Sequence, residues 1–414
     1  MNYKRLGDYI EPCNEKNIGN KIKLLQGISN RKYFQKAKTN TIGVDLSKYR
    51  IVRTGQFAFN RATTRNGDRI SIALRFKKDC IVSPSYRIFK SKDENILNSE
   101  YLMMWFKRPE FDRYARFRSH GSAHEFFDYD EMCDVTLPIP SIEKQQHIVD
   151  EYNTVTNRIQ LNEKINTNLE ATAQALYKHW FVDFEFPYVT SSGVEMPYKS
   201  SGGEMVYNEE LDKEIPEEWS LKRLVDISKI KGGKRMPSGS SLIKNKTNHT
   251  YIKVADLGKY KYVQFNDKFE FVPEDIANKI SRYITHKNDV IISIVGTIGV
   301  VKILGDSLDG ANLTENCMKI TELKKISPSY LYHYLVSKEG KEEIQIRNVG
   351  AVQAKLPMYN IESLPILIPS EFVLKKFNEL IYDLDKKINT QIFHTKTLQE
   401  LQSLLLAKMT KAEA

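Results

Sequence analysis

The chain has 414 residues, of which 41% are hydrophobic and 28% charged, so it can bury several cores and general disorder is excluded. Its length predicts about three structural units of ordinary domain size. The longest apolar run, Val290 to Leu304, is too short and too interrupted to span a membrane, and no apolar block of a signal peptide follows the basic N-terminus. The four cysteines form no CxxC pair, which argues against a zinc site and fits a reducing cytoplasm.

The net charge of +10 is concentrated in the first third of the chain. Residues 1–140 hold 26 Lys and Arg against 16 Asp and Glu, whereas the remaining residues are balanced. A localised basic excess favours a polyanionic partner such as nucleic acid. The alternative is a soluble basic domain that has no such partner.

The first 140 residues predict a mixed α/β domain. Short β-like runs such as Gln56–Phe59 are bounded by glycine and asparagine. The segment LPIPS at 137–141, followed by Glu143, predicts the start of a long helix.

The chain contains an internal repeat. Residues 99–180 align without a gap on residues 328–409, at an offset of 229, and both copies keep the same hydrophobic register. Nearer the start of each copy the offset falls to 218, where Lys4-Arg5-Leu6 matches Lys222-Arg223-Leu224. The sequence therefore predicts one unit written twice, with a second mixed α/β part at 219–365 and a second long helix after ILIPS at 366–370.

Both predicted helices carry a heptad seam. Apolar residues recur at alternating steps of four and three, up to Trp180 in the first copy and Met409 in the second. Both seams turn polar at the same two central steps, so Asn162 and Asn166 would meet Thr395 and Gln391, or the reverse, if the helices pair. Alternatively, each helix packs on its own domain and these polar residues face water. The predicted interface comprises Ile148, Tyr152, Val155, Ile159, Asn162, Asn166, Leu169, Leu176, Phe377, Ile381, Leu384, Ile388, Gln391, Thr395, Leu398 and Leu405.

The sequence predicts neither a catalytic site nor a metal site. It contains no GxxxxGK[ST] phosphate loop, no HExxH pair and no deaminase pattern of HxE with PCxxC. Gly296-Thr297-Ile298-Gly299 lacks the dinucleotide-binding spacing and is interpreted as a turn between strands.

Basic and polar loops in both halves are candidates for contact with DNA. Arg, Asn and Thr are side chains that bind guanine, adenine and phosphate, and Arg predominates over Lys in the first half. A solvated charged surface is the alternative. The candidate residues are Arg61, Thr63, Thr64, Arg65, Asn66, Arg116, Arg118, His120, Ser122 and His124 in the first half, and Lys231, Lys234, Arg235, Arg347, Gln353 and Lys355 in the second.

These features together resemble the specificity subunit of type I restriction–modification systems. The resemblance rests on the duplicated segments LPIPS and ILIPS, each of which ends an α/β part and precedes a long helix. It rests also on ALYKHWFVDFEFP at 175–187 and on GAVQAKL at 350–356. In the first half the corresponding segment is Gly121–His124, where His124 stands in the place of Gln353.

The resemblance implies an α+β fold with an internal pseudo-two-fold repeat, in which two long helices pair as an antiparallel coiled coil between two α/β target-recognition domains. We expect the first recognition domain at 1–140, the first helix at 141–186, a linker at 187–218, the second recognition domain at 219–365 and the second helix at 366–414. The linker is expected because Pro187 to Pro216 is rich in Ser, Gly and Glu.

The resemblance further implies a non-catalytic subunit that reads a bipartite, asymmetric site in double-stranded DNA. The expected partners are two methyltransferase subunits and restriction/translocase subunits, which would carry S-adenosylmethionine, ATP and Mg²⁺. No cofactor, metal or membrane association is expected for this chain, and its expected location is cytoplasmic. The alternatives are a duplicated protein-binding adaptor, or a methyltransferase or nuclease fragment with its own activity.

Overall fold

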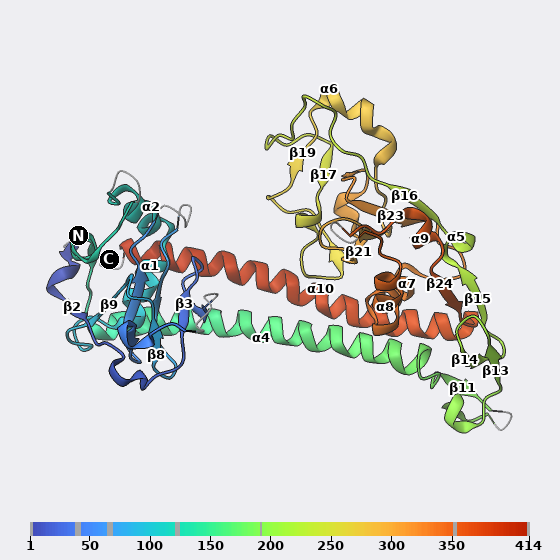
Figure 1. The fold of residues 1–414 in the computed structure, drawn as a ribbon, viewed down its shortest axis with the longest axis horizontal. Helices are drawn as coiled ribbons and strands as arrows, with labels where there is room; N and C mark the ends of the chain where they lie inside the picture. The colour runs from blue at the N-terminus through green and yellow to red at the C-terminus, as the bar shows by residue number, and fades with distance from the viewer. Residues whose placement is uncertain are drawn as a thin grey trace. The chain divides into compact units, whose positions relative to one another are not determined.

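The computed structural model describes residues 3–37, 43–63, 69–120, 125–190, 193–350 and 354–411. It divides into two compact units, each of which is described by itself (Figure 1). Unit 1 comprises residues 1–164 and 391–414, and unit 2 comprises residues 165–390. Both boundaries fall within long helices, so each unit contains residues from both copies of the repeat.

Unit 1 is built on an antiparallel four-stranded sheet of order β2-β9-β6-β7. Its central strand β6 and its edge strand β7 are mainly apolar and buried. The sheet strands are β2 (Ile10–Cys13), β6 (Phe57–Asn60), β7 (Ile72–Leu74) and β9 (Tyr86–Ser91). Three strand pairs accompany it: β1 (Tyr3–Arg5) with β10 (Thr136–Pro138), β3 (Gln26–Ile28) with β4 (Phe34–Lys36), and β5 (Arg50–Val52) with β8 (Cys80–Val82). The short helices are α1 (Ser99–Lys107), α2 (Pro109–Phe117) and α3 (Tyr129–Cys133).

Unit 2 has a five-stranded sheet of order β16-β23-β20-β21-β18, whose edge strand β18 runs parallel to β21. These strands are β16 (Lys229–Gly232), β18 (Tyr262–Val263), β20 (Val290–Ser293), β21 (Val301–Leu304) and β23 (Cys317–Thr321). A second sheet contains β17 (Thr250–Ile252), β19 (Glu270–Phe271) and β22 (Asn312–Leu313), and β15 (Ser220–Arg223) pairs with β24 (Pro365–Ile368). The short helices are α5 (Leu224–Ile227), α6 (Glu274–Ala277), α7 (Pro328–Val336), α8 (Lys338–Ile346) and α9 (Met358–Glu362).

The structure confirms the internal repeat. Helices α1, α2 and α3 begin and end 229 residues before α7, α8 and α9. The contacts repeat as well. The Tyr101 hydroxyl donates to the Pro138 carbonyl at 3.0 Å, and the equivalent Tyr330 hydroxyl donates to the Leu367 carbonyl at 2.7 Å.

The segment 187–218, expected to form a linker, contains two β-hairpins. Strand β11 (Pro187–Val189) pairs with β12 (Glu195–Pro197), and β13 (Met205–Asn208) pairs with β14 (Lys213–Pro216). The Phe186 ring stacks on Tyr198 and on Trp219, so aromatic packing orders the segment. Composition alone did not reveal these contacts. Gly202, at φ +86°, ends the short 3-10 turn Lys199–Ser201 between the two hairpins.

The two long helices, α4 (Ile142–Phe181) and α10 (Glu371–Lys408), pack antiparallel within each unit (Figure 1). In unit 1, the Gln402 side chain near the end of α10 donates to the Thr156 hydroxyl near the start of α4, at 2.8 Å. In unit 2, the rings of Trp180 and Phe181 at the end of α4 contact Phe377 at the start of α10. This confirms the predicted fold class of α/β parts joined by an antiparallel pair of long helices.

The predicted seam residues are all buried or half-buried. Asn162 is fully buried and Thr395 is 4% exposed, and their polar side-chain atoms have no partner among the described residues. The Gln402–Thr156 hydrogen bond sets a register that brings Asn162 level with Thr395 in unit 1. Each unpaired buried polar group costs about 1–3 kcal/mol, so this layer contributes register rather than stability. The assignment of every seam residue to the helix interface remains a prediction.

A buried ion pair fastens the edge strand of unit 2 to α10. The Lys261 ammonium lies 2.7 Å from the Asp385 carboxylate, which also accepts a hydrogen bond from the Tyr262 hydroxyl at 3.0 Å. Burial lowers the pKa of Lys261, and the carboxylate of Asp385 opposes that shift. Because an unpaired charge at this depth is costly, the pair fixes β18 against the helix.

The cores of the two units are completed in the same way. Trp180, at the end of α4, belongs to the core of unit 2, and Met409, its repeat equivalent directly after α10, belongs to the core of unit 1. Met409 is 1% exposed although it lies close to the C-terminus. The sheet of each recognition part therefore shares a core with a helix end that belongs to the other copy.

We expect Met409→Ala to destabilise unit 1 by about 2–5 kcal/mol, because it removes a buried side chain from a packed core. Leu404→Ala is the matched control, because Leu404 is 61% exposed on the same helix, and it should change stability by no more than about 0.5 kcal/mol. Hydrogen exchange of the amides of β6 and β9 measures the effect. Equal protection in the two variants would show that Met409 does not hold the core of unit 1.

Candidate nucleic-acid interface

Three segments meet beside the main sheet of unit 1. Short β-bridges connect Ala62 with Phe126 and His120 with Phe126, so the end of β6, the end of α2 and the segment before α3 lie together. The Thr63 hydroxyl bonds the Ser119 hydroxyl at 3.0 Å and the Glu125 carbonyl at 3.1 Å. We call this meeting point the unit 1 junction, defined by residues 60–63, 116–120 and 125–128. It brings together the described ends of the two basic loops that the sequence indicates.

The arginines of the unit 1 junction are held by carboxylates. Arg61 lies over the Phe126 ring at 4.6 Å and donates to Asp128 at 3.2 Å. Arg116 pairs with Glu125, and Arg118 pairs with Asp134 at 2.9 Å. Exposed ion pairs of this kind contribute little stability, so they orient the guanidinium groups and can still exchange a carboxylate for a phosphate.

Two of the predicted DNA contacts are occupied by partners within their own units. Thr63 is only 4% exposed and its hydroxyl is occupied within the unit 1 junction. In unit 2, Arg347 is half-buried, pairs with Glu343 and donates to the Ser363 hydroxyl at 3.3 Å, which ties α8 to the end of α9. The sequence marks both residues as polar but does not reveal the partners that occupy them.

Some predicted contacts lie outside the described residues. They are Thr64, Arg65, Asn66, Ser122, His124 and Gln353.

Unit 2 has an equivalent junction. Lys355 forms β-bridges with Val295 and with Val349, and the latter pair is the repeat equivalent of the Phe126–His120 bridge. Gly296 and Gly299 have φ values of +77° and +80° in the turn between β20 and β21, which confirms the turn predicted there. We call this meeting point the unit 2 junction, defined by residues 294–299, 347–350 and 354–356.

The basic segment Lys231–Arg235 lies at the same end of the unit 2 sheet as the turn after β20. Gly232 of β16 and Ile292 of β20 both pair with Met318 of β23, so β16 and β20 end at the same level on the two sides of β23. A Cβ atom on Gly233 would lie 2.0 Å from the Thr314 carbonyl oxygen. The second glycine is therefore required by the close approach of two backbones, and it is no evidence for nucleotide binding.

The cations of this segment differ in how they are held. The Arg235 guanidinium lies 2.6 Å from the Glu315 carboxylate, which raises the pKa of Arg235 although its side chain is 78% exposed. The Lys234 ammonium lies over the Tyr283 ring at 5.6 Å. Lys231 and Lys355 are exposed and form no ion pair with the residues that the structure describes. Exposed lysines with free charges are suited to phosphate.

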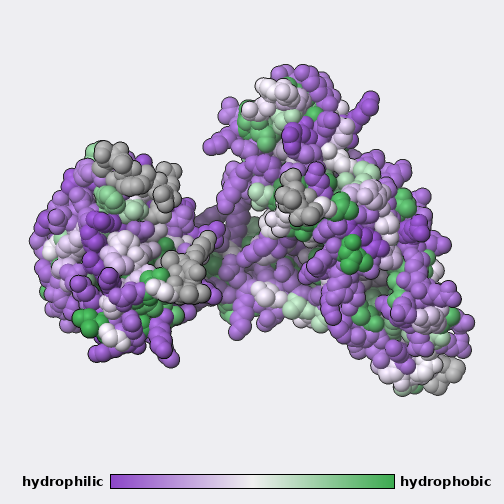
Figure 2. All heavy atoms as spheres, viewed as in Figure 1, coloured by the Kyte–Doolittle hydropathy of each residue, from purple (hydrophilic) through white to green (hydrophobic). Residues whose placement is uncertain are grey.

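A large apolar residue is exposed at the same repeat position in both units. Phe117, the last residue of α2, is 83% exposed, and Ile346, the last residue of α8, is 72% exposed. Each precedes by three residues the bridge residue of its junction, His120 or Val349. The face in Figure 2 is mostly hydrophilic, with hydrophobic residues in small separate patches. A repeated apolar tip at a basic junction indicates a contact surface.

Arg87 is a further cation of the unit 1 junction that was not predicted from the sequence. Its guanidinium binds Asp128 through two hydrogen bonds, of 2.5 and 2.9 Å. Burial opposes ionisation of Asp128, but the hydrogen bonds from Arg87 and from the Tyr129 amide hold the pKa of this carboxyl below its usual value. Arg87 lies in a strand with buried neighbours, so only the fold reveals that it reaches the junction.

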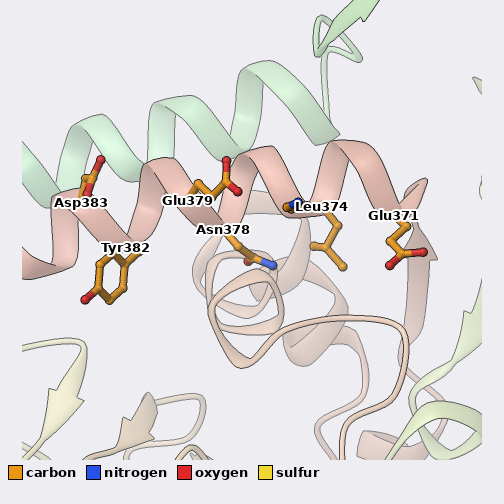
Figure 3. Close-up of a pocket in the computed structure, with 7 residues that line it drawn as sticks. Glu371, Leu374, Asn378, Glu379, Tyr382 and Asp383 are labelled. Atoms are coloured by element: carbon orange, nitrogen blue, oxygen red, sulfur yellow. The ribbon is translucent and has the colours of Figure 1, made fainter.

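A shallow groove in unit 2 runs along the first turns of α10 (Figure 3). Leu374, Asn378 and Tyr382 recur every four residues and project from one side of the helix, as Figure 3 shows. Tyr382 is 67% exposed, and Phe372 on the same helix is 50% exposed. The groove is lined by Glu371, Leu374, Lys375, Asn378, Glu379, Tyr382 and Asp383.

No helix of the described ranges is long and apolar enough to cross a membrane. Within those same ranges, no group of three or more His, Cys, Asp or Glu residues is arranged to hold a metal ion.

One family model matches this chain twice. The model is that of the type I restriction modification DNA specificity domain, and it matches residues 11–171 and 216–402. These matches cover most of the chain, and each includes one junction and the start of one long helix. The chain therefore belongs to the family of type I restriction–modification DNA specificity domains.

Curated relatives carry the same designation. The MjaIX specificity subunit of Methanocaldococcus jannaschii is 27% identical over 323 residues, which cover 76% of this chain and 69% of the relative. The HindI specificity subunit of Haemophilus influenzae is 22% identical over 432 aligned residues, which cover 93% of this chain and 92% of the relative. A crystal structure of the type I S subunit from M. genitalium has a similar fold, with a TM-score of 0.52 at 13% identity over 99% of this chain and 96% of that one.

We expect Phe117→Ser and Ile346→Ser to weaken DNA binding without unfolding the chain. Removing an apolar side chain that becomes buried against DNA costs about 1.5–3 kcal/mol of binding free energy. Stability should change by no more than about 0.5 kcal/mol, because both side chains are exposed in the free protein. Titration of the full chain with duplex DNA measures the effect. Phe393→Ser, at an exposed position on α10, is the control, and equal binding by all three variants would contradict the assignment.

Proposed function

We propose that this chain is the sequence-specific DNA-recognition subunit of a type I restriction–modification complex, and that each unit reads one half of a bipartite site. The observation that carries the proposal is the junction found in both units. The same three-segment arrangement recurs at repeat-equivalent positions and carries cations in both units. Membership of the DNA specificity family supports DNA as the ligand.

The two half-sites should differ in sequence. The bridge residues His120 and Phe126 in unit 1 correspond to Val349 and Lys355 in unit 2. A shared backbone frame with different side chains presents different donors and apolar contacts to the bases. The recognised site should therefore be asymmetric. We propose recognition domains at residues 1–140 and 219–365, as expected from the sequence.

The chain itself is proposed to be non-catalytic. The sequence contains no phosphate loop, no metalloprotease pattern and no deaminase pattern. We propose that methylation and cleavage, with S-adenosylmethionine, ATP and Mg²⁺, belong to two methyltransferase subunits and to restriction/translocase subunits in the cytoplasm. The MjaIX and HindI relatives are specificity subunits of type I restriction enzymes, which supports a division of roles between different subunits.

A docking surface for a partner subunit is proposed along the start of α10. The groove there combines the exposed ring of Tyr382 with carboxylates such as Glu379, and Phe372 is exposed on the same helix outside the groove. Exposed aromatic residues on a helix are typical of protein interfaces. A duplicated adaptor that binds only proteins would use such a surface, but it would not need two cationic junctions.

We expect substitutions in one unit to relax one half of the recognised site. His120→Ala in unit 1 and Lys355→Ala in unit 2 should each lower binding by about 1–3 kcal/mol if the side chain contacts a base. The measurement is the spectrum of methylated sites in DNA treated with the assembled complex that contains each variant. His120→Ala should change the preference in one half-site only, and Lys355→Ala in the other.

The control is Lys338→Ala, at an exposed position of α8 outside both junctions. It should leave the site spectrum unchanged. A change in both half-sites caused by one unit 1 substitution would contradict the assignment of one half-site to each unit.

A further inference from the structure

Four charged side chains form a compact group in unit 1. Asp128 receives two hydrogen bonds from Arg87 and one from Arg61, at 3.2 Å. The Tyr129 amide donates to the same carboxylate at 2.8 Å. Its side-chain oxygens are therefore fully engaged, and both guanidinium groups are fixed in orientation.

Arg50 is a third guanidinium in this group. It lies on β5, and its Nη1 donates to the Asn14 side-chain oxygen at 2.7 Å. Asn14 follows Cys13, which pairs with Ile88 in the register of β2 and β9, so Asn14 and Arg50 lie beside Arg87. Burial lowers the pKa of Arg50, the neighbouring charges of Arg87 and Arg61 lower it further, and Asp128 raises it. Among the described residues, Arg50 forms no ion pair with a carboxylate.

The group carries three positive charges around one carboxylate. Like charges at short range disfavour each other, and partial burial strengthens that effect. Binding of a further anion to the group would reduce this repulsion between the guanidinium groups. Guanidinium groups match phosphate oxygens in pairs, and the group adjoins the unit 1 junction through Arg61.

Arg53 shows what a satisfied arginine looks like in the same part of the chain. It lies three residues after Arg50 and pairs with Glu15 at 2.5 Å and with Asp79 at 2.6 Å. These two carboxylates more than balance its charge. The contrast is with Arg50, which has no carboxylate partner among the described residues.

We propose that Arg50, Arg61 and Arg87 form a binding site for DNA backbone phosphate, and that Asp128 is the positioning residue of this site. The inference rests on the proposed function and deepens it. The carboxylate holds two guanidinium groups in a fixed direction and offsets part of their charge. Phosphate is then bound where its geometry fits, while attraction to arbitrary DNA is limited.

A purely structural role is the competing explanation for Asp128. Its side chain also caps the start of α3, in a reciprocal pair of hydrogen bonds with Glu131. Asparagine is an equally good residue at such a cap, so Asp128→Asn removes the charge and keeps the capping group. This variant therefore separates the two roles.

The first experiment measures binding of random-sequence duplex DNA by the full chain as a function of salt. Arg50→Ala and Arg87→Ala should each reduce the slope of log affinity against log salt by about one, the value for one lost phosphate contact. Arg53→Ala is the matched control and should leave the slope unchanged. If Arg50→Ala and Arg87→Ala bind with the slope of Arg53→Ala, the phosphate site is wrong.

The second experiment tests the positioning role. Asp128→Asn should bind random DNA more tightly and with a steeper salt slope, while its preference for the recognised site falls. Arg87→Lys should keep the slope, because it keeps the charge, and lose site preference, because it loses the two-pronged geometry. Arg87→Lys should keep the melting temperature of the wild type, and Asp128→Asn should lower it slightly, because the repulsion among the guanidinium groups is no longer offset. Loss of both binding modes together with a lower melting temperature would assign Asp128 a structural role and overturn the proposal.

Failure of the proposed function would give a different result. If the wild-type chain binds duplex DNA without salt dependence or sequence preference, the DNA-recognition role is wrong. If the wild type shows both properties and all the variants behave like it, only the arginine site is wrong.

Discussion

The antiparallel packing of α4 and α10 is the interaction on which the structure depends. Each helix starts beside its own recognition part and ends in the core of the other unit, where Trp180 and Met409 occupy equivalent places. Neither copy of the repeat contains all the residues of one core. The hydrophobic contribution of these helix ends is therefore available only when both copies are folded, which makes the duplication a requirement of stability.

The same exchange explains how the two units can share a frame and differ in recognition. The helices, the exit strands β10 and β24 and the hydrogen bonds of Tyr101 and Tyr330 are repeated because they build the cores. Exposed junction side chains such as Arg116 and Lys355 are free of that constraint, because they take no part in the cores. Unit 2 also carries the edge strand β18, held by the buried pair of Lys261 and Asp385. The two units can therefore keep the same core contacts and present different side chains at their junctions.

Much of this architecture could be predicted from the sequence. The gapless offset of 229 residues, the heptad seam and the exit prolines are local or periodic signals, and they located the paired helices and the repeat. Contacts between side chains that are distant in the sequence could not be predicted in this way. Arg347 and Thr63 are polar in the sequence but are occupied in the structure by Glu343 and by Glu125.

Arg87 is the opposite case, a junction residue that the sequence did not predict. It stands in a buried strand, 41 residues before its partner Asp128, so no local pattern marks it. The hairpins at 187–216 were missed for a related reason, because a composition rich in Ser, Gly and Glu conceals the aromatic stacking that orders them. In each case the deciding contact joins residues that are distant in the sequence, and only the fold brings them together.

The most direct test of two-unit recognition is the methylated sequence produced by the complex assembled around the wild-type chain. Single-molecule sequencing of the methylated DNA identifies that sequence without any assumption about the site. Two short, different half-sites separated by unspecified bases are the predicted result. A continuous or palindromic site, or a site that stays the same when this chain is replaced by a specificity subunit with different junction residues, would contradict recognition by two units of this chain.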